Sequence, residues 1–253
     1  MTTLAVIPAR LGATRLPRKP LRLLGGVPLV VRVWERLTAL AVADRVVVAT
    51  DSEEVRRSAA DAGADCILTD AAHPSGTDRV AEVAHRPEFT SYDVILNVQG
   101  DEPFLPGDAA RGAVGMVTSG AFPLGTAAVP ASAEILGAPD VVKVVRADDG
   151  RALYFSRAAI PFLRDPTDRE TRDAMVLQHL GIYAYTREAL AQWVTLPPHP
   201  LERVEKLEQL RPLAAGLAMG VALVDDEAPR GIDTEEDLRF ANDRWTTSMS
   251  GRA

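Results

Sequence analysis

Apolar and polar positions follow two alternating patterns over about the first 100 residues. Short apolar runs rich in β-branched residues predict buried strands at LAVIP (4–8), RVVVAT (45–50), CIL (66–68) and YDVILNVQ (92–99). Between these runs, apolar residues at helical spacing predict helices over 28–40 and 76–86. Asp51, with Glu54 three residues on, is expected to cap a further helix. This alternation predicts an α/β fold with a mostly parallel sheet flanked by helices on both faces.

The pattern changes after about residue 120. Few helical patterns separate the strand-like stretches LGTAAVP, VVKVVRA, ALYFSRAAIPF and HLGIYAYT. These stretches predict a smaller antiparallel layer, inserted in the parallel core or laid beside it. We expect it to cover approximately residues 124–195 of a single domain formed by residues 1–253.

The last part of the chain returns to a helix–strand–helix pattern. A strand is expected over 220–225 and a helix over 234–245. Before them, one long amphipathic helix is predicted over 200–216, because five apolar residues form a single stripe: Leu201, Val204, Leu207, Leu210 and Leu213.

Composition removes several classes of protein. The chain has 253 residues, of which 47 % are hydrophobic, and a formal charge of −7, which disfavours general electrostatic binding of nucleic acid. Cys66 is the only cysteine, so an internal disulfide or a thiolate zinc site is excluded. No run of 18 apolar residues is present, and the N-terminus lacks the basic region of a signal peptide. We therefore expect a cytoplasmic protein without a membrane span.

The segment IPARLGATRLPRKP (7–20) is purely basic, although the whole chain is acidic. It follows the first predicted strand, at the sheet edge where open α/β folds bind ligands. Gly12 allows the backbone to approach a phosphate closely, and Arg15 and Lys19 supply positive charge. The segment matches neither the P-loop nor the dinucleotide-binding pattern. It favours a triphosphate site, and the alternative is a solvated loop.

Two acidic motifs are candidates for a metal site. Asp101 follows the strand in NVQGDEPF (97–104), and Asp233 precedes Thr234 in GIDTEEDL (231–238). Mg²⁺ is held by one or two carboxylates together with substrate phosphates, which suits two such residues near a phosphate loop. The alternatives are an acidic turn at the first motif and a helix cap at the second.

HPSGTDR (73–79) opens a predicted helix with small residues followed by Arg79. Its backbone amides could bind a base edge or an anion, and the alternative is again a helix cap. The four histidines are too scattered for a zinc signature, and no GxSxG or HExxH motif indicates a hydrolase.

Taken together, the motifs resemble the 3-deoxy-manno-octulosonate (Kdo) cytidylyltransferase family over about residues 4–240. They occur in this order: PARLGATRLPRKPL, HPSGTDR, NVQGDEP, VVKVV, ALYFSRAAIP, HLGIYAY, PLERVEKLEQLR and GIDTEEDL. The resemblance implies a nucleotide-diphospho-sugar transferase-like fold and a homodimer formed through the antiparallel insertion. It also implies Mg²⁺-dependent transfer of CMP from CTP to Kdo, with release of pyrophosphate, for lipopolysaccharide synthesis in Gram-negative bacteria.

The resemblance also assigns roles to residues of this chain. The triphosphate loop corresponds to Arg10, Thr14, Arg15 and Lys19. The cytidine-reading positions correspond to Ser75, Arg79 and Gln99, and the Mg²⁺ carboxylates to Asp101 and Asp233. The sugar pocket corresponds to Arg157, Arg164, His179, Tyr183, Glu208 and Gln209. Of these, the residues expected to act in catalysis are Arg15, Lys19, Asp101 and Asp233.

Three rival functions remain at this stage. One is a cytidylyltransferase for another keto-acid sugar, either 8-amino-Kdo or a sialate. The ALYFSRA and LEQLR segments disfavour the sialate enzyme. Another is a sugar-1-phosphate nucleotidyltransferase, which would carry a GG-x-GTR-type loop where this chain has LGATR. The third is a non-catalytic nucleotide-sensing protein, which need not keep the two metal carboxylates.

Overall fold

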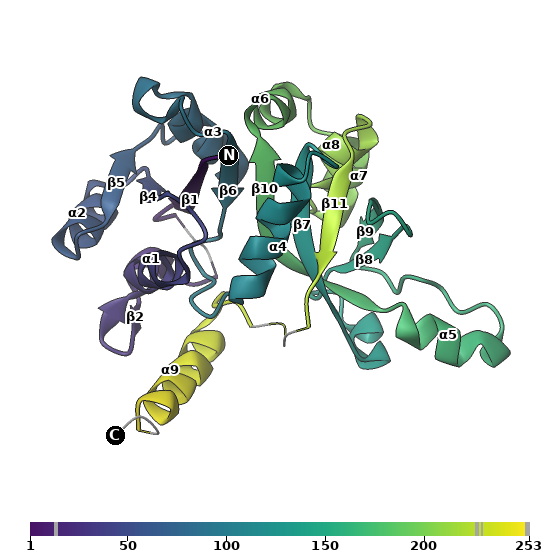
Figure 1. Ribbon diagram of the computed structural model, residues 1–253. Helices are drawn as coiled ribbons and strands as arrows, with labels where there is room; N and C mark the ends of the chain where they lie inside the picture. The colour runs from purple at the N-terminus through teal and green to yellow at the C-terminus, as the bar shows by residue number, and fades with distance from the viewer. Residues whose placement is uncertain (13–14, 226–227, 229, 251–253) are drawn as a thin grey trace. The chain divides into compact units, whose positions relative to one another are not determined.

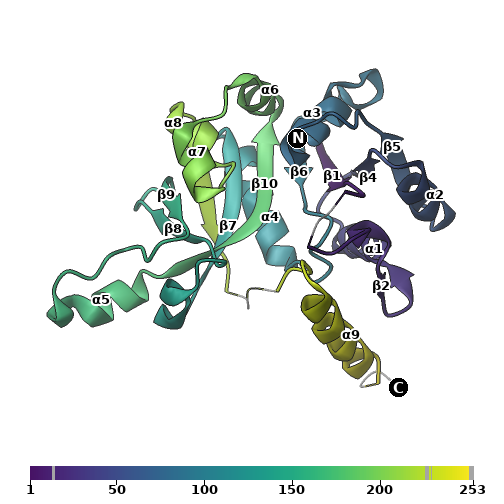
Figure 2. The ribbon, with the colours of Figure 1, turned by 180° about the vertical axis from the view of Figure 1, so that it is seen from behind.

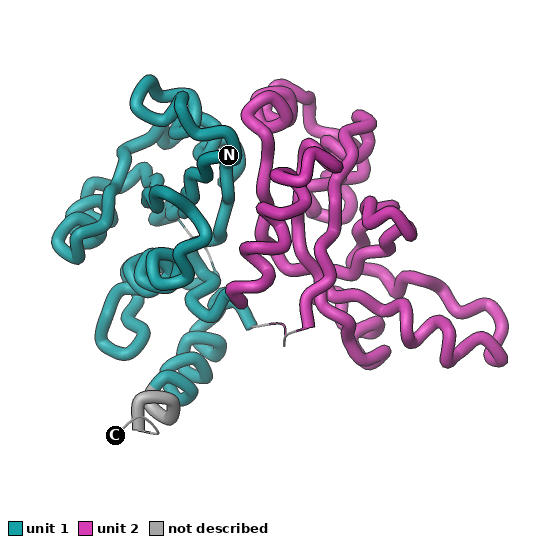
Figure 3. Tube along the Cα trace, viewed as in Figure 1, with its two compact units in different colours: residues 1–105, 229–253 teal, residues 106–228 magenta. Residues whose placement is uncertain are grey.

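The computed structural model describes residues 1–12, 15–225, 228 and 230–250, with side chains through Trp245. The chain forms two compact units, one of residues 1–105 and 229–253 and the other of residues 106–228 (Figure 3). Within the described residues, no helix is both long enough and apolar enough to cross a bilayer. The expected single domain with an insertion over approximately 124–195 stays a prediction.

Four parallel strands form the sheet of the first unit (Figure 1). They lie in the order β6-β1-β4-β5, and their bounds are Val94–Asn97, Thr3–Ala9, Arg45–Thr50 and Asp65–Leu68. Val6 of β1 pairs with Val47 of β4 and with Asn97 of β6, and all three are fully buried. The predicted parallel sheet is therefore confirmed.

Helices α1 (Leu29–Leu40), α2 (Glu53–Asp61) and α3 (Gly76–His85) connect these strands and pack on them. The chain moves in one direction from β1 through β4 to β5, then crosses back to β6. Because such crossovers are right-handed, α1 and α2 lie on one face and α3 lies on the other (Figure 2). One expectation is wrong here: the cap of α2 is Ser52, whose Oγ accepts from Val55 N at 3.4 Å, and not Asp51.

Shorter elements complete the first unit. They are the 3₁₀ turns η1 (Lys19–Leu21) and η2 (Pro87–Phe89), the hairpin of β2 (Leu23–Leu24) and β3 (Val27–Pro28), and the C-terminal helix α9 (Glu235–Ser250).

Mixed pairing distinguishes the sheet of the second unit. Strands β7, β8, β9, β10 and β11 span Leu124–Pro130, Lys143–Arg146, Ala152–Ser156, Leu177–Thr186 and Met219–Leu223. β10 is antiparallel to β7 and to β8, β8 is antiparallel to β9, and β11 is parallel to β7. The predicted antiparallel layer is thus confirmed.

Helix α4 (Gly107–Thr118) packs on β7, β10 and β11, and α6 (Arg187–Thr195) packs on β10. The connection between β7 and β8 contains η3 (Ala133–Gly137). The connection between β9 and β10 contains η4 (Pro166–Asp168) and α5 (Arg169–Ala174).

The single helix predicted over 200–216 is wrong. The segment forms α7 (Pro200–Glu205) and α8 (Leu210–Ala214), and Lys206 ends α7 in a left-handed conformation with a φ of 55°. Pro212 has no backbone N–H, so it is tolerated in the first turn of α8 but would interrupt a continuous helix. The expected stripe is split accordingly, since Val204 is 82 % exposed.

Candidate functional site

The carboxyl ends of β1 and β6 mark the point where the strand order reverses. The chain leaves β1 toward β4 on one side, and β6 lies on the other side. In open α/β sheets, ligands bind in the crevice at such a reversal. The segment after β1 carries Arg10, Arg15 and Lys19, and the segment after β6 carries Gln99 and Asp101. Thr14 lies outside the described residues.

Lys19 links two carboxylates that are far apart in the sequence. Its Nζ donates to Asp101 Oδ2 at 2.5 Å and to Asp233 Oδ1 at 2.8 Å. The other oxygen of Asp233, Oδ2, accepts from Arg15 Nη2 at 3.0 Å. Lys19 is 18 % exposed, whereas Arg15 is 69 % exposed. The residues expected to act in catalysis thus lie together in the first unit.

A capping turn holds Asp233 at this position. Thr234 Oγ1 accepts from Asp237 N at 3.1 Å, while Asp237 Oδ2 accepts from Thr234 N at 2.9 Å and from Asp233 N at 3.1 Å. Thr234 therefore caps α9, and the carboxylate of Asp233 is not used in the cap. Ile232 N donates to Asp101 O at 3.0 Å, which fixes the turn to the segment after β6.

Electrostatics in this cluster depend on burial as well as on charge. Burial alone would lower the pKa of Lys19, but the charges and hydrogen bonds of Asp101 and Asp233 outweigh it and raise that pKa. Burial raises the pKa of the neighbouring Glu102 to about 8, and the charges of Asp101 and Asp233 add to this shift. Glu102 was missing from the predicted site, although it directly follows Asp101 in the sequence.

The two carboxylates suit a hard divalent cation. Because both accept from the same ammonium group, their oxygens face one point. Among the residues that the structure describes, no group of three or more His, Cys, Asp or Glu side chains is arranged to hold a metal ion. A pair of carboxylates is the donor set with which Mg²⁺ is commonly bound beside substrate phosphates. Asp101 and Asp233 therefore fit a Mg²⁺ site.

Two of the cytidine-reading candidates lie near the start of α3. Ser75 is the N-cap of this helix, and its Oγ accepts from Asp78 N at 3.2 Å. At Gly76, an added Cβ would lie 3.4 Å from Pro8 Cγ and 3.9 Å from Gln99 Oε1. The end of β1, the start of α3 and Gln99 therefore meet at one place, where the absence of a side chain leaves room.

Arg79 is held from several sides and is only 3 % exposed. It donates through Nη2 to Asp51 Oδ2 at 3.0 Å and through Nη1 to Thr69 Oγ1. Asp51 Oδ1 in turn accepts from Leu11 N at 3.4 Å. Asp51 therefore joins the segment after β1 to Arg79. Arg10 is exposed.

All six sugar-pocket candidates belong to the second unit, and four of them lie close together. His179 of β10 has its Nε2 2.9 Å from Thr126 Oγ1 of β7, and its ring centroid lies 5.5 Å from that of Tyr183. Burial raises the pKa of Tyr183, and the charge of Glu208 contributes to this shift. Gln209 follows Glu208 in the chain, and its buried Nε2 has no hydrogen-bond partner among the described residues.

His179 is neutral in the folded protein, because burial lowers its pKa to about 3. The Thr126 hydroxyl has one proton, which it donates to Ile182 O at 2.6 Å. It must therefore accept from His179, so the imidazole proton lies on Nε2 and Nδ1 is left as an acceptor.

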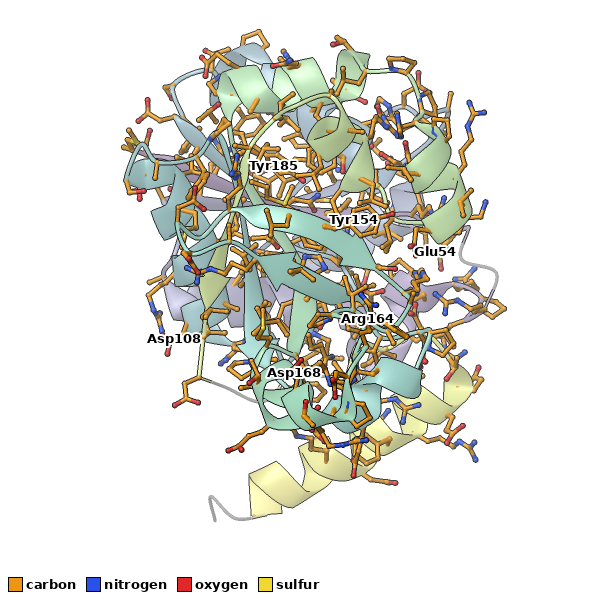
Figure 4. All side chains as sticks on the ribbon, turned by 90° about the vertical axis from the view of Figure 1, so that its right-hand side faces the viewer. Glu54, Asp108, Tyr154, Arg164, Asp168 and Tyr185 are labelled. Carbon is orange, nitrogen blue, oxygen red and sulfur yellow. The ribbon has the colours of Figure 1, made fainter. Side chains whose placement is uncertain are left out.

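The two arginines of the set have different surroundings. Arg157 donates through Nε to Glu205 O at 2.9 Å and through Nη1 to Pro139 O at 3.0 Å. Arg164 is exposed in the connection between β9 and β10 (Figure 4).

Comparison with known proteins gives consistent results. The chain matches the cytidylyltransferase family over residues 4–221. It is 64 % identical over 245 residues to a 3-deoxy-manno-octulosonate cytidylyltransferase of Gemmatimonas aurantiaca, covering 97 % of this chain and 95 % of the relative. It is 46 % identical over 240 residues to the protein of the same description from Polynucleobacter necessarius, covering 93 % and 92 %.

Solved structures extend the comparison. One is described as CMP:2-keto-3-deoxy-manno-octonic acid synthetase complexed with CTP; it has a TM-score of 0.90 and 36 % identity, covering 98 % of this chain and 100 % of the other. A 4-diphosphocytidyl-2C-methyl-D-erythritol synthase from Anaerococcus prevotii has a TM-score of 0.63 at 14 % identity, covering 97 % and 98 %, and shares the fold.

Proposed function

The chain belongs to the 3-deoxy-manno-octulosonate cytidylyltransferase family, and from this premise we propose that Lys19, Asp101 and Asp233 form the centre of its reaction. The activity is transfer of CMP from CTP to Kdo, which activates the sugar for lipopolysaccharide synthesis. The assignment of these residues rests on one observation: the ammonium group of Lys19 donates to both carboxylates near the point where the strand order reverses.

The reaction is a displacement at the α-phosphorus of CTP. The anomeric hydroxyl oxygen of Kdo bonds to this phosphorus and gives up its proton to water. The bond to the oxygen bridging the α- and β-phosphates breaks, and pyrophosphate leaves. Such transfers depend on positioning and on neutralisation of charge. Arg10, Thr14, Arg15 and Lys19 would bind the triphosphate, with Arg15 and Lys19 offsetting the charge of the leaving pyrophosphate.

Asp101 and Asp233 would hold Mg²⁺ in the complex with nucleotide. When bound, this ion polarises phosphate oxygens and lowers the pKa of the attacking hydroxyl. The capping turn supports this role for Asp233, since its own carboxylate is left out of the cap of α9.

Cytosine would be read where β1, the start of α3 and Gln99 meet. Ser75 and Gln99 offer polar atoms there, and Asp51 holds Arg79 in a fixed orientation. Sites that hydrogen-bond a substrate discriminate strongly against analogues that leave those groups unpaired. CTP is therefore the expected donor rather than ATP or GTP.

The second unit would bind the sugar. Neutral His179 can accept a hydrogen bond at Nδ1 from a sugar hydroxyl, and the buried Nε2 of Gln209 can donate one. Tyr183 and Glu208 would complete the hydroxyl contacts, while Arg157 and Arg164 would pair with the Kdo carboxylate.

A homodimer formed through the second unit is part of the same proposal. Large apolar side chains of this unit are exposed, among them Phe162 at 82 %, Leu153 at 52 % and Met175 at 48 %. These side chains would supply the apolar contacts of such an interface. A cytoplasmic location is also proposed, because CTP is a cytoplasmic metabolite.

Two measurements test the function. Pyrophosphate release with Kdo, 8-amino-Kdo and sialic acid, each with CTP and ATP, identifies the substrates, and use of sialic acid without Kdo would contradict the assignment. Asp233→Asn keeps the shape of the side chain but removes one charge from the cluster. We expect its kcat to fall by about 10²–10³ at saturating Mg²⁺. At the same saturating Mg²⁺, CTP affinity should change much less than kcat, because the variant also removes one of the two charges that repel the triphosphate. The melting temperature should change little, and a kcat close to that of the wild type would rule out the metal role.

A further inference from the structure

An apolar cluster joins the three segments that carry Lys19, Asp101 and Asp233. It lies in the first unit, and a member of it lies within three residues of each of these polar side chains. The members are Leu16, Leu24, Leu29, Phe104, Ile232, Leu238, Ala241 and Trp245. The segments that meet at the site are therefore packed against one another behind it.

Helix α9 is fastened to the β2–β3 hairpin by polar contacts as well. Asn242 Oδ1 accepts from Gly25 N at 2.9 Å, and its Nδ2 donates to Leu23 O at 3.1 Å. Trp245 packs against Phe104 with ring centroids 6.0 Å apart. The middle of α9 is thus fixed to the connection between η1 and α1.

An ion pair ties the near end of α9 to η1. Arg22 follows η1, which begins at Lys19, and Glu235 is the first residue of α9, two residues after Asp233. Nη2 of Arg22 donates to Oε2 of Glu235 at 2.8 Å, and Nη1 donates to Oε1. A bidentate pair of this kind fixes the relative orientation of the guanidinium and carboxylate groups as well as the distance between them. Arg22 is 33 % exposed and Glu235 is 58 % exposed, so the pair adds little to folding stability.

We propose that Arg22 and Glu235 are positioning residues, whose ion pair sets the placement of Lys19 relative to Asp233. This inference rests on the proposed function of the Lys19–Asp233 cluster. The physical reason is that phosphoryl-type transfer depends on the placement of charged groups, and displacements of about 1 Å can cost about 10²-fold in rate. An exposed ion pair next to both residues can control that placement without holding the fold together.

The first test compares Glu235→Gln with Glu53→Gln in the full chain. Glu53 is a matched control, because it is also the first residue of a helix and pairs with Arg56 through two contacts, at 2.8 and 2.5 Å. For Glu235→Gln we expect kcat to fall about tenfold at saturating substrates, with the KM for CTP changed by less than about twofold. The melting temperature should stay close to that of the wild type, and Glu53→Gln should keep the wild-type kcat.

The second test reverses the ion pair. Arg22→Glu alone should lower kcat at least as much as Glu235→Gln, and the double variant Arg22→Glu/Glu235→Arg should regain most of the loss. The inference is overturned if Glu235→Gln matches its control in kcat, if the double variant regains nothing, or if kcat falls only together with the melting temperature. Failure of the proposed function is a separate result, because the wild type itself would then release no pyrophosphate from CTP and Kdo.

Discussion

The buried imidazole of His179 makes the stability of the protein depend on pH in a predictable direction. Burial lowers the pKa of this side chain from its ordinary 6.5 to about 3. Between these two values the unfolded chain binds a proton at this position and the folded chain does not. Stability at this residue is therefore complete above pH 6.5 and is lost progressively as the pH falls toward 3.

The size of the effect follows from the two pKa values. A pH of 5 is 1.5 units below the pKa of the imidazole in the unfolded chain, which is 6.5. This difference corresponds to a loss of about 2 kcal/mol in the free energy of unfolding. For a chain of 150–250 residues, about 1 kcal/mol shifts the melting temperature by about 2–4 °C. Lowering the pH from 8 to 5 should therefore lower the melting temperature by about 4–8 °C through His179 alone.

The assay is thermal unfolding of the wild type and of His179→Gln at pH 8 and pH 5. Gln can still donate a hydrogen bond to Thr126 but does not titrate, so the variant should lose about 4–8 °C less than the wild type between the two pH values. Because the two proteins share all their other titrating groups, subtracting one pH-dependent loss of melting temperature from the other removes the contribution of those groups. His85→Gln is the control, since it changes an exposed histidine of the first unit. An equal loss in wild type and His179→Gln would refute a buried neutral imidazole.

Two further predictions concern packing and buried charge. Asp51→Asn should lower the unfolding free energy by about 3 kcal/mol, because the buried Arg79 loses its charged partner. Chemical denaturation measures this loss, and a change below about 1 kcal/mol would contradict the prediction. Gly125→Ala should destabilise by about 3 kcal/mol, because an added Cβ would lie 2.1 Å from Ala113 O. Gly115→Ala is its control, because Gly115 lies on α4, the helix that carries Ala113, and an added Cβ there would meet no atom within 4 Å. We expect this variant to be neutral or stabilised by about 0.5 kcal/mol.

Strands were predictable where burial gave them a continuous apolar run. The run RVVVAT coincides with β4, because a strand covered on both faces of a sheet needs apolar residues throughout. Helix α4 was not predicted, because its buried residues are mostly glycine and alanine, which give a weak apolar pattern. These small residues allow close packing on the sheet, as Gly112 shows, where an added Cβ would lie 2.7 Å from Ala222 Cβ.

The candidate site was predictable in its residue types but not in its pairing. Asp101 and Asp233 could be associated through the metal that their chemistry suits. The role of Lys19 as a bridge between them depends on contacts across more than 200 positions, which one sequence does not reveal. Asp51 shows the same limit locally: both Asp51 and Ser52 are good capping residues, and only the structure shows that Ser52 caps while Asp51 pairs with Arg79.

The basic N-terminal segment is largely neutralised by acids from elsewhere in the chain. Arg15 and Lys19 pair with Asp101 and Asp233, so two cations face two anions. Because its pKa is raised to about 8, Glu102 is mostly protonated at neutral pH and adds little charge. The cluster itself therefore carries no clear excess of positive charge for a triphosphate.

This balance bears on how a triphosphate could bind. If Arg15 and Lys19 turn to the phosphates, they leave two carboxylates beside a polyanion, and like charges at such distances repel strongly. If Asp101 and Asp233 held a divalent cation, both problems would be removed, because the acids would be neutralised and the two basic side chains would be free for the nucleotide. The charge balance therefore argues that CTP and Mg²⁺ bind together, and that CTP alone should bind weakly however basic the segment appears in the sequence.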